Sequence, residues 1–267
     1  MRQRTTVLGR PAATADLWEG WRNFRLTDLP LHDPAFASAA TFGVTGPLTR
    51  ATRFRLDRNA PLAAYHEVRR LGFEMRPVLP GPLAFLRSMG GDHRLRLLDA
   101  FLEPYAELLE RLATAGAQEV QLDEPPPADP ADLRHLAYAY ERLGELSNRP
   151  RLLVCLCSGE AGPALAVLGA SRVESIAVDF VTTPGNLDGL ARLGGLPRTT
   201  IVAAVVDGCS PGTGQVDTAV TTCAAVSELA DQLVVAASCS PGQQSPLETA
   251  AAVVKIGRVR WAGLNRV

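Results

Sequence analysis

The feature that most constrains the fold is a regular alternation of short apolar runs with longer segments of helical period, which starts near residue 58. Six short runs, rich in β-branched and other apolar residues, predict strands. Because these runs are apolar nearly throughout, both faces of the sheet are expected to be covered, as in a parallel sheet flanked by helices. The predicted strands cover residues 73–79, 119–124, 151–157, 175–180, 200–207 and 232–238.

Segments of helical period separate these strands. The clearest covers residues 93–116, where Gly116 provides a C-terminal stop. The others cover residues 130–147, 160–169, 186–194, 215–230 and 245–257. Upstream, a strand is predicted over residues 4–9, then a short helix over residues 15–24, and a second strand between residues 40 and 57.

Eight strands in a chain of 267 residues predict an α/β fold, the (β/α)8 TIM barrel, with residues 1–267 as a single domain. The alternative is an open doubly wound sheet. That fold would place a G-x-G-x-x-G phosphate turn after the first strand, and the stretch VLGRPAAT lacks this spacing.

The charge balance argues against nucleic-acid and membrane partners. The net charge is −1, with basic and acidic residues mixed along the chain. No apolar run approaches the roughly 20 residues that span a bilayer, and the first residues lack the apolar stretch of a secretory signal. We therefore expect a cytoplasmic protein, in which the five cysteines do not form structural disulfides.

Function in a TIM barrel is located at the C-terminal ends of the strands. Cys155 and Cys157 are two residues apart at one such end, so their side chains point to the same face. Together with Cys239 and the carboxylate of Asp179, they predict a zinc site with an open coordination position. The alternative is that these cysteines are small core residues, the role expected for Cys223 in its helix.

Four stretches together resemble the cobalamin-independent methionine synthases and their single-barrel relatives, over about residues 70–250. They are LGFEMRPVLPGPLAFL, LLDAFLEPYAELLERLATAGAQEVQLDEP, SIAVDFV and LVVAASCSPGQQSP. In that family two barrels are fused, and the C-terminal one holds a catalytic zinc through a His-x-Cys pair, a Glu and a Cys at three strand ends. In this chain those places hold Cys155 and Cys157, Asp179, and Cys239. The family's N-terminal barrel is a degenerate copy without these ligands, and several stretches resemble that copy equally well.

The resemblance implies a zinc-dependent methyltransferase of methionine biosynthesis that acts on a small thiol such as homocysteine. The donor would be methyltetrahydrofolate, or methylcobalamin carried by a corrinoid protein. Asp123 resembles the residue that holds the amino group of homocysteine, and it is the predicted catalytic residue. Glu124 and Arg53 complete the predicted substrate-binding set.

Three questions stay open at this point: the function of the chain, the role of Asp123 and the role of three arginines. The chain is either this enzyme, a non-catalytic barrel that serves as a binding module, or a zinc lyase or hydrolase on the same barrel. Asp123 either binds substrate or caps the helix that follows it. The arginines at positions 50, 53 and 76 either steer an anionic ligand or are solvated surface charges.

Overall fold

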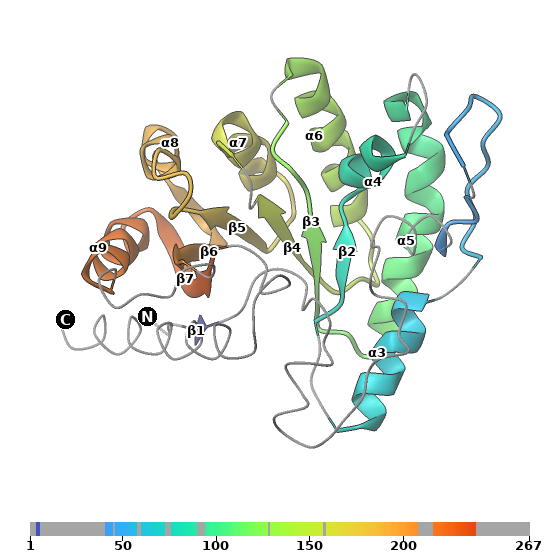
Figure 1. Ribbon diagram of the computed structural model, residues 1–267, viewed down its shortest axis with the longest axis horizontal. Coiled ribbons are helices and arrows are strands. Elements are labelled where there is room, and N and C mark those ends of the chain that lie inside the picture. Colours follow the sequence, from blue (N-terminus) through green and yellow to red (C-terminus); the bar gives the residue numbers. More distant parts are fainter. Residues whose placement is uncertain are drawn as a thin grey trace.

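In a computed structural model of the chain, seven parallel strands form one curved sheet in the order β1-β7-β6-β5-β4-β3-β2 (Figure 1). The structure describes residues 4–5, 41–44, 46–57, 60–72, 76–89, 94–127, 129–156, 159–207 and 216–238. The strands are β1 (Arg4–Thr5), β2 (Val78–Pro80), β3 (Glu119–Asp123), β4 (Arg151–Leu156), β5 (Ser175–Asp179), β6 (Leu196–Val206) and β7 (Ala230–Ala237).

The predicted α/β fold is confirmed. The strands follow one another in sequence order across the sheet, and the first strand, β1, lies beside the last, β7. This parallel order is the one found in a (β/α)8 barrel, and within the described residues the sheet ends at β1 and β2. The assignment of residues 1–267 to a single barrel domain stays a prediction, because residues 6–40 and 239–267 lie outside the described part of the chain.

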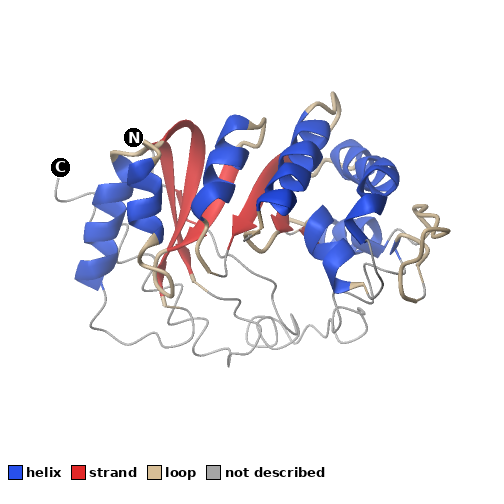
Figure 2. Ribbon diagram, turned by 90° about the horizontal axis from the view of Figure 1, so that it is seen from above, coloured by secondary structure: helices blue, strands red, loops and turns tan. Residues whose placement is uncertain are grey.

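Helices cover the outer face of the sheet (Figure 2). The helices described are α3 (Ala60–Arg70), α4 (Pro82–Ser88), α5 (Leu98–Thr114), α6 (Pro130–Gly144), α7 (Gly162–Ala170), α8 (Asn186–Arg192) and α9 (Val216–Ser227), and a 3-10 turn, η1 (Arg94–Leu97), precedes α5. The short helix α4 was not predicted. Among these helices, none combines the length and the apolar character needed to cross a bilayer. The helices predicted over residues 15–24 and 245–257 lie outside the described residues.

The strands bury side chains on both faces, as their apolar composition predicted. Leu152, Val154 and Leu156 of β4 belong to the large core between the sheet and the helices. The residues between them, Leu153 and Cys155, belong to a separate, smaller cluster on the inner face of the sheet. That inner cluster also contains Ala177, Val202, Ala204, Val234 and Ala236, which come from three neighbouring strands.

The strand predicted between residues 40 and 57 is wrong for the described residues 41–44 and 46–57, which contain no strand. The aromatic side chains of this segment pack on α5 instead of entering the sheet. The ring centroids of Phe42 and Phe54 lie 4.7 Å and 5.1 Å from that of Phe101. The backbone closes on itself through bonds from the Arg55 N–H to the Phe42 carbonyl and from the Asp57 N–H to the Thr41 carbonyl. Figure 1 shows the segment beside α5 at the edge of the molecule.

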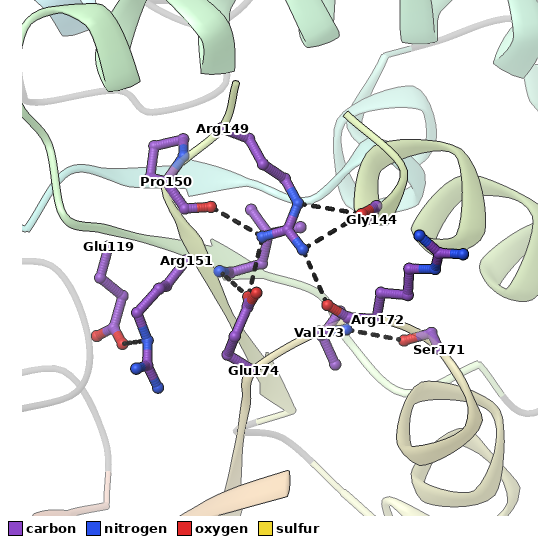
Figure 3. Close-up of polar contacts among 10 residues, drawn as sticks. Glu119, Gly144, Arg149, Pro150, Arg151, Ser171, Arg172, Val173 and Glu174 are labelled. Atoms are coloured by element: carbon purple, nitrogen blue, oxygen red, sulfur yellow. Dashed lines mark hydrogen bonds and ion pairs between the residues drawn. The ribbon is translucent and has the colours of Figure 1, made fainter. Parts of the chain in front are cut away.

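Arg149 joins the end of α6 to the starts of β4 and β5 at the amino-terminal edge of the sheet (Figure 3). Its guanidinium donates to the backbone carbonyls of Gly144, Pro150 and Arg172. It also donates to Glu174 Oε2 at 3.0 Å, and the same oxygen accepts a bond from the Leu152 N–H. The side chain of Arg149 is only 11% exposed. We assign this network to stability, because it ties α6 to the starts of β4 and β5 at the amino-terminal edge of the sheet.

Replacing Arg149 by Met is expected to lower the free energy of unfolding by about 2 kcal/mol, because three carbonyls and one carboxylate lose a buried donor. Equilibrium unfolding in urea measures the change. The matched control is Arg142→Met, in which the lost ion pair with Asp99 joins side chains that are 50% and 71% exposed. That control is expected to change stability by less than about 0.5 kcal/mol. Equal losses in the two variants would contradict the assignment of Arg149.

Candidate functional site

The C-terminal ends of β3, β4 and β5 form the candidate site. In the register of the sheet, Asp123 is paired with Cys155, and Cys155 is paired with Ala177. Side chains alternate along a strand, so Asp123 lies on the face opposite to Val120 and Leu122, which pack in the outer core. Asp123 and Cys155 therefore occupy neighbouring positions on the inner face, as the prediction of a shared site requires.

Cys155 is 5% exposed and is packed among the small apolar side chains of the inner cluster. Cys157, Cys209 and Cys239 lie outside the described residues, so the predicted convergence of Cys155, Cys157 and Cys239 stays a prediction. Cys223 is buried in α9 and belongs to the outer core, as expected. Burial raises the pKa of its thiol to about 12, which suits an inert packing residue.

Asp179 ends β5 and is 2% exposed. Its Oδ1 accepts bonds from the Val181 and Thr182 N–H groups at 2.8 and 2.9 Å, and its Oδ2 accepts a bond from the Thr182 hydroxyl at 2.6 Å. Both carboxylate oxygens thus stabilise the turn that follows the strand. Within the described ranges, no three metal-binding side chains gather at one point. Three thiolates suit zinc chemically, so a metal site in this chain would depend on the cysteines and not on Asp179.

Asn186, at the start of α8, connects the loops that follow β4 and β5. Its Oδ1 accepts a bond from the Ala161 N–H at 2.8 Å, and its Nδ2 donates to the carbonyls of Asp179 and Gly159 at 2.9 and 3.3 Å. The side chain is buried. Sequence reasoning missed this residue, because its partners come from two loops that are adjacent only in the fold.

Glu124 is buried at 1% exposure and serves the backbone of α4. Its carboxylate accepts bonds from the N–H groups of Leu83 and Ala84 at 3.3 and 2.7 Å and from the Tyr140 hydroxyl at 3.1 Å. A Cβ atom at Gly81 would lie 1.8 Å from Glu124 Oε2, so the close approach requires glycine. The structure therefore gives Glu124 a capping role, and a direct contact with substrate stays a prediction.

Burial raises the pKa of the Glu124 carboxyl to about 8, although its hydrogen bonds act in the opposite direction. In the unfolded chain this group returns to its ordinary pKa of 4.5. The folded state holds the Glu124 proton more tightly than the unfolded chain does. The stabilisation that this proton gives is therefore complete below pH 4.5 and is lost as the pH rises through 8. The free energy of unfolding is expected to fall by roughly 1 kcal/mol per pH unit between pH 5 and 8.

Urea unfolding at a series of pH values measures that slope. Glu124→Gln, which cannot ionise, is expected to remove it. Glu145→Gln is the control, since Glu145 is exposed and follows α6. A slope that persists unchanged in Glu124→Gln would contradict the assignment.

Arg53, the remaining predicted substrate ligand, is exposed in the segment that packs on α5. Its Nη1 lies 3.4 Å from the carbonyls of Ala51 and Thr52, its own neighbours in the chain. The structure therefore does not place Arg53 among the strand-end residues. Its surroundings favour the interpretation of a solvated surface charge.

The side chain of Arg76, in contrast, is largely buried, at 20% exposure. Arg76 precedes β2 and donates to Glu119 and Gln121 of β3. Gln121 in turn donates to Asp123. The sequence does show an arginine and a glutamine on adjacent predicted strands, but only the parallel register of β2 and β3 brings them together.

Comparison with known proteins identifies relatives of this chain. Residues 45–231 match the sequence family described as "Cobalamin-independent synthase, N-terminal domain". The 5-methyltetrahydropteroyltriglutamate–homocysteine methyltransferase of Streptomyces griseus is 42% identical over 200 residues, which are 71% of this chain and 26% of that protein. The yeast protein of the same name, from Saccharomyces cerevisiae, is 34% identical over 172 residues, which are 60% of this chain and 22% of the relative. The chain thus spans about a quarter of the length of the curated relatives it matches.

Solved structures share the fold at low sequence identity. A B12-independent methionine synthase from Shewanella superposes with a TM-score of 0.61 at 17% identity, over 84% of this chain and 71% of that one. A methyltransferase from Methanosarcina mazei superposes with a TM-score of 0.63 at 15% identity, over 97% of this chain and 94% of that one. These similarities support the same fold for this chain.

Proposed function

Since the chain belongs to the family of the cobalamin-independent synthase N-terminal domain, we propose that it serves the methylation of homocysteine by a methylfolate, as a barrel that binds these substrates at its strand ends. The observation that carries the proposal is the 42% identity to a homocysteine methyltransferase over 200 residues. The family is described as cobalamin-independent, so we propose methyltetrahydropteroyltriglutamate as the donor, without a methylcobalamin or a corrinoid protein.

The match to an N-terminal domain favours a binding barrel over a complete enzyme. In the resembled family the N-terminal copy lacks the zinc ligands, and Asp179 here uses both carboxylate oxygens within its own turn. Asp123 is the residue that we propose for contact with substrate. Its carboxylate lies on the inner face of the sheet, where it accepts a bond from the buried Gln121.

A second candidate function is zinc-dependent methyl transfer by this chain itself. The observation that favours it is the position of Cys155 on the inner face, paired in register with Asp123. Cys155, Cys157 and Cys239 would hold the ion, while the carboxylate of Asp179 would stay bonded within its own turn. Bound zinc lowers the pKa of an acceptor thiol, so that the thiol is a nucleophilic thiolate at neutral pH. A zinc lyase or hydrolase would use the same ligands, but nothing in the described geometry favours it.

Asp123→Asn is expected to weaken homocysteine binding tenfold to a hundredfold, because an ammonium group loses a charged acceptor. Isothermal titration calorimetry of the full chain with homocysteine and with methyltetrahydropteroyltriglutamate measures the affinities. The matched control is Asp99→Asn, which removes a carboxylate that is 71% exposed on α5. Failure of the wild-type chain to bind either compound would refute the proposed function.

Zinc content and methyl transfer separate the two candidates. Protein purified without chelators is analysed for metal before and after zinc is offered under reducing conditions. Near-stoichiometric zinc that is lost in a Cys155→Ser/Cys239→Ser variant, but kept in Cys223→Ala, would establish the zinc enzyme. Substrate binding without zinc and without turnover would establish the binding barrel. Asp179→Asn is expected to keep any zinc present, because we assign Asp179 to its turn.

A further inference from the structure

A chain of polar contacts on the inner face of the sheet leads from the start of β2 to Asp123. Arg76 Nη1 donates to Glu119 Oε1 at 3.2 Å, and Arg76 Nη2 donates to Gln121 Oε1 at 3.0 Å. Gln121 Nε2 then donates to Asp123 Oδ1 at 2.8 Å. Gln121 is fully buried, and the side chains of Arg76 and Glu119 are only 20% and 27% exposed. Water therefore has little access with which to replace these contacts.

The two partners of Gln121 select the same orientation of its amide. A guanidinium only donates hydrogen bonds, so Arg76 requires the carbonyl oxygen of the amide on its side. The amide nitrogen then faces Asp123, whose carboxylate accepts. A flipped amide would place an N–H group against the guanidinium and an oxygen against the carboxylate, and both contacts would be repulsive. Arg76 thus ensures that the Asp123 carboxylate faces the amide nitrogen of Gln121 and not its oxygen.

We propose that Arg76 is a positioning residue that acts through Gln121 to hold Asp123 as an oriented acceptor for the ammonium group of a small aminothiol. This inference rests on the proposed function, in which the strand ends bind homocysteine. Glu119 accepts a bond from the other terminal nitrogen of the guanidinium, and Arg151 Nε lies 4.0 Å from the second oxygen of Glu119. The geometry of the substrate contact is therefore set by residues at the opposite end of the strands.

The test compares two ligands that differ by a single amino group. L-Homocysteine and 4-mercaptobutanoate are titrated into the wild-type chain and into Arg76→Met, Arg76→Lys and Gln121→Glu. Arg70→Met is the matched control, because Arg70 pairs with Glu67 on the surface of α3, where the two side chains are 72% and 39% exposed.

Arg76→Met is expected to weaken homocysteine binding about tenfold and to leave 4-mercaptobutanoate binding unchanged. Arg76→Lys keeps a cationic donor and is expected to recover part of the affinity. Gln121→Glu replaces the donor by an acceptor and is expected to weaken homocysteine binding at least as much as Arg76→Met. Unchanged homocysteine affinity in Arg76→Met, or an equal loss for both ligands, would overturn the proposal.

A second measurement needs no ligand. The side-chain amide of Gln121 is followed by ¹H–¹⁵N NMR, and its hydrogen exchange is measured. Arg76→Met is expected to shift this signal and to speed its exchange, whereas Arg70→Met is not. An unaffected signal in Arg76→Met would overturn the positioning role. If the signal responds as expected but the wild-type chain binds neither thiol, the positioning role stands and the proposed homocysteine function fails.

Discussion

The parallel register of the sheet is the constraint on which the rest of the structure depends. Because successive side chains point to opposite faces, a slip of one residue in β4 would move Cys155 into the outer core and Val154 into the interior. The register also pairs Asp123 with Cys155 and brings Gln121 beside Val78. Both the apolar packing under the helices and the polar chain on the inner face follow from this one alignment.

Much of this frame could be predicted from the sequence, because β-branched apolar runs and helical periodicity are local signals. The strands at 119–123, 151–156 and 175–179 lie within one or two residues of their predicted bounds. The short helix α4 escaped prediction because its capping group is remote. The carboxylate of Glu124 serves the N–H of Ala84 from 40 positions further along the chain. Nothing in the stretch PGPLAFL reveals that partner.

The candidate site, like the fold, could be predicted only in part. The positions of Asp123 and Cys155 on the inner face were predictable from strand alternation. Their partners were not, since Arg76 reaches Gln121 across 45 positions of sequence. A strand was also predicted between residues 40 and 57, where the described residues contain none. The aromatic residues of this segment are typical of strands, but they pack on α5. Sequence patterns thus indicated where the site lies, while side-chain roles depended on contacts between distant segments.

The buried amide of Asn186 has a mechanical consequence. One side chain satisfies backbone groups from the loop after β4 and from the end of β5, so neither loop can shift without breaking bonds that hold the other. The two loops are therefore linked, and opening either one would cost buried hydrogen bonds of the same amide. A contact that holds one of these loops in place therefore also holds its neighbour, through a single buried amide.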